Sequence, residues 1–444
     1  MKTIAFPTPR SRQTSRSIPH GGEGNSAGNS SKESAAKRKM LGFDAVRGVA
    51  ALAVVLLHAC VPYLQNPMPG LAWTVRDSAS RSVDWLFWGI EVFIMPLFLV
   101  LAGYFAWQTL SCRGIGPLVR SRAKRLLVPL AFAVCVVLPM DLYTWVLGWV
   151  VEGIVEPVKL KSLKFDGVVD RDLWGLSHLW FLQYVFLYVV VAAIFARFDR
   201  LRNFTTKITQ RMPLAVTLLA AAGVVTLMIA PEVVWGFQHA FLPVASKWVY
   251  SGTFFAAGML VGKVDPRLAF FENRTIPLAI ASVMLLVTAV SLGRWNLQYG
   301  ESALAQSGLA VVTVLAAYAV TFLTIAVSRK INHLSLPLQY LAAASFWIYL
   351  VHHPILGLVH LDLKQWMPAT APAVKMATAF CISVGLSLLT YEGLVRRTRL
   401  GRMLGMQWTP SSPPVDVLPM RRESVVTDTD TESVTENVPQ RRAA

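Results

Sequence analysis

FDAVRGVAALAVVLLHACVPY (residues 43–63) is the stretch that decides the fold, because it places Arg47 and His58 inside an apolar run of membrane length. Ionisable groups in such a run cost several kcal/mol, and they usually mark function. The two residues are eleven positions apart, so on a helix they lie on nearly the same face, separated by roughly 16 Å along the axis. The stretch therefore predicts a membrane-spanning helix with a polar line through it.

Composition extends this prediction to the whole chain. Of the 444 residues, 54% are hydrophobic and only 15% are charged, which excludes an ordinary soluble protein. Apolar segments recur at about 44–64, 85–107, 126–148, 178–196, 212–230, 245–263, 275–293, 304–327, 338–360 and 371–394. We therefore predict an all-α, polytopic membrane bundle of about ten transmembrane helices, in the plasma membrane or an endomembrane.

The net charge of +17 lies in alternate loops, with cationic clusters at 113–125, 197–211, 263–274, 329–330 and 396–402. By the positive-inside rule, both termini are predicted to be cytoplasmic. This distribution also argues against nucleic acid as a partner.

The amino-acid composition divides the chain into three regions. Residues 1–40 and 401–444 are poor in apolar residues and are predicted to be disordered cytoplasmic tails around a membrane domain at 41–400.

Motifs for metals, nucleotides and hydrolytic nucleophiles are missing from the sequence. The four cysteines have no ligand spacing, and no Walker, HExxH, GxSxG or dinucleotide fingerprint occurs. We expect no metal and no permanently bound cofactor. Gly252, Gly258 and Gly262 in the sixth segment indicate close helix packing rather than chemistry.

Several polar residues are predicted to share one depth in the outer half of the membrane. With alternating helix directions and a rise of about 1.5 Å per residue, five segments bring ionisable groups to this level. These residues and their neighbours are His58, Glu91, Asp141, His178, Trp180, Tyr349, His352 and His353. The convergence predicts a buried polar site.

Structural alternatives stand beside this interpretation. A histidine in an apolar helix commonly donates to a backbone carbonyl, and one of His352 and His353 is a candidate to satisfy carbonyls freed by Pro354. Glu91 and Asp141 are equally compatible with structural ion pairs, and Arg47 with an i,i+3 pair to Asp44. Tryptophans 85, 88, 145, 149 and 180 lie near predicted boundaries, and most are expected to form an aromatic belt.

Together, these residues resemble the integral-membrane acyltransferase-3 family, and within it the branch of the glucan biosynthesis protein C succinyltransferases. The resemblance rests on the Arg47–His58 spacing, GIEVFIMPLFLVLAGYF (89–105), SHLWFLQYVFLYVV (177–190), the glycine-rich sixth segment and SFWIYLVHHPIL (345–356). One departure is Ala102, where the family commonly has serine. The resemblance covers 41 to about 400.

The resemblance implies an O-acyltransferase that moves an acyl group of the acetyl or succinyl class. The donor would be cytoplasmic acyl-CoA, a co-substrate, and the acceptor a hydroxyl of a glycan or small metabolite. The separation of Arg47 and His58 suits the pantetheine arm, so we expect Arg47, helped by Arg122 and Arg125, to bind the CoA phosphates.

At the other end of the arm, His58 is expected to act as general base, because an imidazole exchanges protons near neutral pH. Glu91 or Asp141 would orient it. His178, Trp180, Tyr349 and His352 are the candidate donors to the oxyanion. No cysteine is placed as an activated nucleophile, so direct transfer is expected.

An alternative from another class is a transporter or exporter of a polar or lipid-linked metabolite, which would use the same polar layer as a midplane binding site. No clear internal repeat relates the two halves of the sequence, and this speaks against a transporter. A membrane scaffold without activity explains the convergence of polar groups least well.

Overall fold

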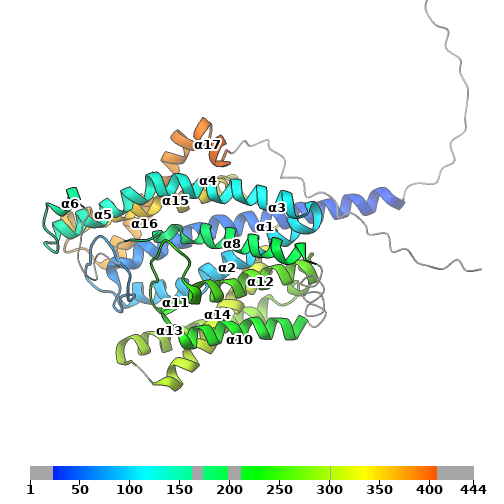
Figure 1. Cartoon of the computed structure of the whole chain (residues 1–444), viewed down its shortest axis with the longest axis horizontal. Coiled ribbons are helices and arrows are strands. Elements are labelled where there is room, and N and C mark those ends of the chain that lie inside the picture. Colours follow the sequence, from blue (N-terminus) through cyan, green and yellow to red (C-terminus); the bar gives the residue numbers. More distant parts are fainter. Residues whose placement is uncertain (1–23, 163–173, 199–211, 301, 408–444) are drawn as a thin grey trace, which may run out of the picture.

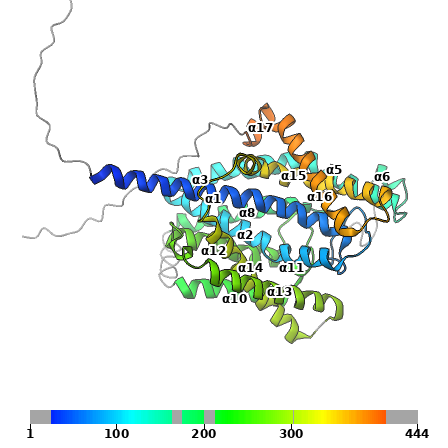
Figure 2. The same cartoon turned by 180° about the vertical axis from the view of Figure 1, so that it is seen from behind.

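The computed structural model describes residues 24–162, 174–198, 212–300 and 302–407, and within them it is helical without strands. Most helices run roughly parallel along one axis (Figures 1 and 2). The helices are α1 (Gly24–Cys60), α2 (Arg81–Arg113), α3 (Ile115–Arg122), α4 (Val128–Phe132), α5 (Leu138–Val151), α6 (Lys159–Ser162), α8 (Trp180–Arg197), α10 (Met212–Ile229), α11 (Glu232–Trp235), α12 (Ala245–Val264), α13 (Thr275–Tyr299), α14 (Ala303–Ser328), α15 (Leu336–Trp366), α16 (Pro372–Thr390) and α17 (Arg399–Leu404).

The predicted all-α polytopic bundle is confirmed, but the span count differs. Each of the ten apolar segments is helical, and eight candidate membrane spans are long and apolar enough within the described residues. The fifth segment falls short in length, since its apolar part is Leu214–Ile229. The sixth is α12, in which two lysines and several small polar residues dilute the apolar content.

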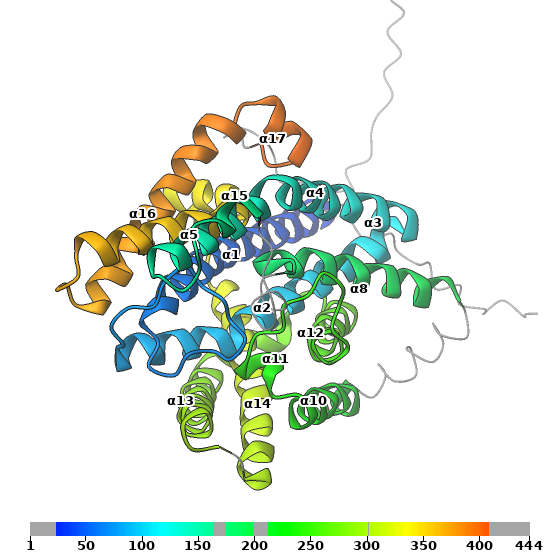
Figure 3. The same cartoon turned by 60° about the vertical axis from the view of Figure 1, so that its left-hand side comes forward.

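Helix α1 lies at the centre of the bundle (Figure 3). It packs mainly against α15 and also contacts α2, α14 and α16. Three of the sequence motifs, on α1, α2 and α15, are therefore neighbours in space. This arrangement surrounds His58 with the polar residues of other helices.

Two prolines shape the third span, which runs from Ile115 to Val151. Pro129 and Pro139 each lack the N–H that would bond four residues back. The turns before them, Ala123–Leu127 and Ala133–Val137, widen into π-helix. The span thus continues through both prolines and places Asp141 in α5.

Small residues bring α2 and α12 into close contact, as the sequence predicts for the sixth segment. A Cβ on Gly258 would overlap the Val100 carbonyl oxygen, and one on Gly103 would overlap the Phe255 carbonyl oxygen. Only glycine allows this backbone approach. However, α12 also contributes Lys247 to the site described below, so its role is not packing alone.

The predicted division into tails and a membrane domain stays a prediction. The backbone of residues 24–40 continues α1 upstream of the first span. Residues 1–23, 408–444 and most of the cationic cluster at 197–211 lie outside the described residues.

An ion pair joins the loop after α1 to α16. Lys375 Nζ, fully buried, lies 2.7 Å from Asp77 Oδ2, and Asp77 Oδ1 accepts from the Ser78 N–H at 2.6 Å. Burial by itself raises the pKa of Asp77, but the hydrogen bonds from Lys375 and Ser78 outweigh it, so the pKa lies below its ordinary value.

This pair predicts a pH-dependent contribution to stability. Because the pKa of Asp77 is lower in the folded chain than in the unfolded one, the contribution is present above about pH 4 and is lost as the pH falls through the folded value. Lys375→Met should lower the unfolding free energy by about 3 kcal/mol at pH 7. Unfolding of wild type and variant in detergent from pH 7 to 3 checks this. A difference in Tm that does not shrink below pH 4 would contradict it.

Candidate active site

His58 has a defined orientation and tautomer. Its Nδ1 lies 2.9 Å from the Val54 carbonyl oxygen, one turn earlier in α1, and 3.3 Å from His352 Nε2. A carbonyl only accepts, so Nδ1 carries the proton and Nε2 keeps its lone pair. The ring is partly exposed and lines a cavity, in contrast to His352 and His353, which are buried. His58 is therefore arranged to accept a proton through Nε2.

The structure separates the two adjacent histidines of α15. His352 Nδ1 donates to the carbonyls of Tyr349 and Ile348, at 2.9 and 3.1 Å, so its Nε2 accepts from His58. His353 lines the cavity, whereas His352 is not among the lining residues. His352 thus stands beside His58 as a hydrogen-bond partner, and His353 is the one that faces the site.

His178 satisfies the carbonyl that Pro354 frees. A proline at 354 lacks the N–H that would bond to Leu350, four residues back in α15. His178 Nε2 reaches this carbonyl oxygen at 3.1 Å. Nε2 therefore carries the proton and Nδ1 is an acceptor. The sequence suggests a neighbour within α15 for this task, but the donor comes from the segment that precedes α8.

Asp141 connects three of these elements. Its Oδ1 accepts from His353 Nδ1 at 2.7 Å, and its Oδ2 accepts from Ser177 Oγ at 2.8 Å. The carboxylate is fully buried and is not among the cavity-lining residues. It therefore holds His353 and Ser177 rather than the imidazole of His58, for which Val54 and His352 are the partners.

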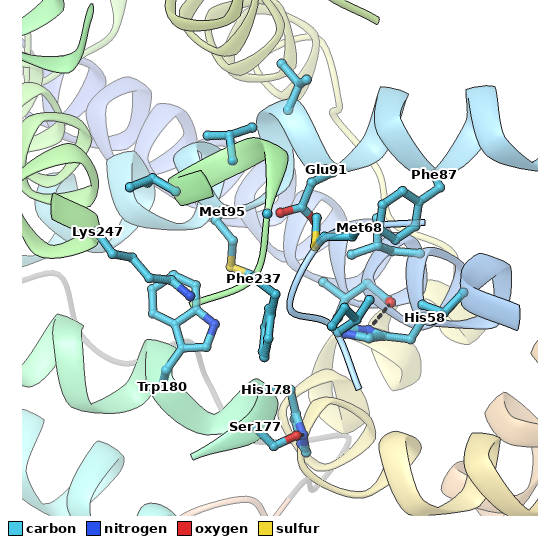
Figure 4. Close-up of a pocket in the computed structure, with 18 of the residues that line it drawn as sticks. His58, Met68, Phe87, Glu91, Met95, Ser177, His178, Trp180, Phe237 and Lys247 are labelled. Atoms are coloured by element: carbon cyan, nitrogen blue, oxygen red, sulfur yellow. Dashed lines mark hydrogen bonds between the residues drawn. The ribbon is translucent and has the colours of Figure 1, made fainter. Parts of the chain in front are cut away.

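A cavity of about 70 Å³ lies beside His58 (Figure 4). A volume this small suits the reacting groups, not a whole substrate. Among its lining residues are His58, Glu91, Trp145, Ser177, His178, Trp180, Phe237, Lys247, Tyr349 and His353. Six of the eight residues predicted to share one depth line this cavity, whereas Asp141 and His352 do not. The chemical roles of the residues stay predictions.

Glu91 and Lys247 both face this cavity. Glu91 forms no hydrogen bond or ion pair within the described part of the chain. Lys247 is 6% exposed; its Nζ lies 3.9 Å from the centre of the Trp180 ring and makes one long hydrogen bond, 3.5 Å, to the Gln238 carbonyl. Figure 4 shows both side chains directed into the same space. Glu91 thus lies near Lys247 and is not hydrogen-bonded to His58.

Of the predicted oxyanion donors, Tyr349 and His178 already have acceptors. The Tyr349 hydroxyl donates to the His178 carbonyl at 2.5 Å, and His178 Nε2 donates to Leu350. The Trp180 indole lines the cavity with no acceptor among the described residues. The Trp145 indole N–H is likewise buried without an acceptor.

Trp145 also corrects the aromatic-belt interpretation. Trp145 is 1% exposed and Trp88 is 0% exposed, so these rings fill the bundle interior instead of facing lipid headgroups. Trp73, in the loop after α1, was missed by sequence reasoning. Its ring stacks on His58 with centroids 6.0 Å apart, and its Nε1 donates to His360. The sequence signal that could have pointed to Trp73 is a tryptophan in the polar loop that follows the first apolar segment.

The predicted CoA-binding cations lie on α1 and around α3. Arg47 donates through Nε and Nη2 to the Ala342 carbonyl of α15, at 3.3 and 3.1 Å, and pairs with Asp44 at 3.1 Å. The side chain is still 52% exposed. Arg122 is half-buried and Arg125 is exposed; within the described residues neither forms an ion pair.

Asp141, His178 and His353 bring potential ligand atoms within 4.8 Å of one another. Imidazoles bind metals in the plane of the ring, at about 2 Å. The rings of His178 and His353 are stacked, with planes only 17° apart and centroids 4.6 Å apart. In the described structure these residues form hydrogen bonds, from His353 Nδ1 to Asp141 and from His178 Nε2 to the Leu350 carbonyl. The absence of a metal stays a prediction.

The family model of the acyltransferase domain, type 3, matches residues 40–392. No curated protein and no solved structure matches the chain. The matched range includes every helix that contributes to the cavity. The chain therefore belongs to the acyltransferase-3 family and is a multi-pass membrane acyltransferase.

Proposed function

We propose that this acyltransferase moves an acyl group of the acetyl or succinyl class from acyl-CoA to a hydroxyl of a glycan or small metabolite, as in the branch of glucan biosynthesis protein C. The observation that carries the proposal is the tautomer of His58. With Nδ1–H held by Val54, the Nε2 lone pair is available to a hydroxyl in the cavity.

The chemical sequence begins when the acceptor hydroxyl enters the cavity and approaches His58. His58 Nε2 takes the hydroxyl proton while the oxygen attacks the acyl carbon. The oxyanion that forms needs donors that are fixed before the reaction, and the free indole N–H groups of Trp180 and Trp145 are suited to this. Trp73, stacked on His58, keeps the ring in place.

Arg47 supports an acyl-CoA donor from the opposite end of α1. Its guanidinium is half exposed and is held in a fixed position by Ala342 and Asp44. Charged donors in fixed positions suit phosphate recognition. Arg122 and Arg125 would add positive charge. The distance along α1 suits a donor whose phosphates lie at one end and whose thioester lies near His58.

Release of free CoA by the purified protein tests this function. We expect acetyl-CoA or succinyl-CoA to be consumed when a glycan acceptor is present. Arg47→Ala should raise the KM for acyl-CoA about tenfold or more with a smaller change in kcat, because the lost contact is made equally in the ground and transition states. Lys330→Ala, which removes an exposed cation on the same predicted side, is the control and should leave KM unchanged.

Failure of every acyl-CoA to bind or react would refute the donor class. An unchanged KM in Arg47→Ala would refute the role of Arg47 alone.

A further inference from the structure

Ser177 stands out by its backbone. It is one of two non-glycine residues with positive φ in the described chain, at 50°. Side chains other than hydrogen are strained in this region, and such strain tends to be kept where function needs it. Ser177 lies just before α8, lines the cavity and is 2% exposed. The fold thus holds a serine in a strained conformation at the reaction site.

The contacts of Ser177 are those of an activated hydroxyl. Oγ donates to Asp141 Oδ2 at 2.8 Å and lies 3.4 Å from His178 Nδ1. His178 Nδ1 is unprotonated, because Nε2 donates to Leu350. A hydroxyl beside an oriented base is the arrangement used for nucleophilic catalysis, and such contacts are often long before substrate binds. The Ser177 N–H donates to His239 Nε2 at 2.9 Å, which fixes the backbone.

Stabilisation of an oxyanion at Ser177 is also available. The Trp145 indole N–H is buried without an acceptor among the described residues, and the centroid of its ring lies 5.9 Å from those of His353 and His239. Ser177 itself precedes the N-terminus of the 18-residue helix α8, where the dipole favours negative charge. A buried donor without an acceptor that lines the same cavity as a strained serine is suited to a substrate oxygen that completes the hydrogen bonding here.

We propose that Ser177 is a nucleophile that carries the acyl group between the two substrates. This proposal rests on the proposed function and replaces direct transfer, which the sequence favours because it offers no activated cysteine. Serine supplies the nucleophile instead.

The first half-reaction forms the bond from Ser177 Oγ to the acyl carbon and breaks the carbon–sulfur bond. The Ser177 proton passes to His178 Nδ1 and from there to the thiolate, which leaves as CoA-SH. Before substrate binds, the hydroxyl donates to Asp141 Oδ2, and for this transfer it turns to His178 Nδ1.

In the second half-reaction, His58 Nε2 takes the proton of the acceptor hydroxyl. The acceptor oxygen attacks the acyl carbon, the bond to Ser177 Oγ breaks, and that oxygen regains a proton from His58. His58 and Ser177 line the same cavity and are joined by His353, whose ring lies 4.8 Å from that of His58, and by Asp141. The overall products are free CoA and the acylated acceptor.

Isotope exchange tests this proposal. The purified protein is incubated with acetyl-CoA or succinyl-CoA and isotope-labelled CoA, without acceptor. An acyl-serine intermediate predicts that label enters acyl-CoA, because the first half-reaction runs in both directions. Ser177→Ala should reduce both this exchange and the transfer about 100-fold or more. Ser282→Ala is the matched control and should retain both. Ser282 is also 3% exposed, but it lies in the regular helix α13 and does not line the cavity.

His58→Ala gives the sharpest contrast. It should lose transfer yet keep exchange, and it should accumulate the acyl group on the peptide that contains Ser177, as read by mass spectrometry after acid quenching. Wild-type protein that transfers the acyl group without exchange would overturn the role of Ser177 and leave the proposed function intact. Absence of both exchange and transfer with every acyl-CoA would overturn both.

Discussion

His58→Ala is expected to lower the rate of acyl transfer by about 10²- to 10⁴-fold, the usual contribution of a general base. Among the histidines of the described chain that line the cavity, only His58 has a partly exposed ring. The Val54 carbonyl holds its Nδ1–H, so Nε2 is the nitrogen that is free to accept a proton. The variant removes this nitrogen. Because Arg47 and the cations near α3 remain, the Kd for acyl-CoA should change little.

Steady-state kinetics of acceptor acylation measures this effect, and His58→Gln is the matched control. A glutamine amide can hydrogen-bond but cannot take up a proton at neutral pH, so it should be as inactive as alanine. Recovery of most of the activity by glutamine would show that His58 positions the acceptor and does not act as a base. Full activity of the alanine variant would move the base to another residue, with His353 as the next candidate in the cavity.

Asp84→Ala is expected to destabilise the bundle by about 3–5 kcal/mol, the cost of leaving one partner of a buried ion pair alone. Asp84 is fully buried on α2, and its Oδ2 lies 2.5 Å from Arg294 Nε on α13. Asn66 donates to the same carboxylate through its N–H and its Nδ2, at 2.9 and 3.2 Å. Arg294, with a side chain 11% exposed, would lose its counter-ion.

Unfolding in detergent, followed for Asp84→Ala, Arg294→Ala and the double variant, separates the pair from its surroundings. We expect the double variant to be less destabilised than the sum of the two single variants by at least 1 kcal/mol, because the second substitution removes a charge that the first one left unpaired. Additive effects would show that the two side chains do not stabilise each other. Acyl transfer per folded molecule should remain near wild type, since neither residue lines the cavity.

The sequence by itself determined the helices and their content of polar groups. Apolar length and charge alternation predict a polytopic bundle, and the period of the helix places Arg47 and His58 on one face. Counting residues along the spans also brings Glu91, His178 and Tyr349 to the level of His58, because depth in a membrane follows directly from position in a helix. The cavity lined by these residues agrees with that estimate.

Only the tertiary structure decided how these groups pair. Depth alone does not fix the rotation of a helix about its axis. The sequence therefore could not tell that His353 faces the cavity. Nor could it tell that Glu91 lies near Lys247 and forms no hydrogen bond to His58. Nor could it tell which distant residue satisfies the carbonyl that Pro354 frees.

That pairing sets the proton positions on which the chemistry depends. The His178 ring comes from another helix, and its bond to Leu350 fixes its tautomer. The strained backbone of Ser177 likewise depends on contacts with Asp141 and His239, far away in sequence. Local sequence sets where a polar group lies along the membrane normal, whereas packing between helices sets its neighbours, and the neighbours set its chemistry.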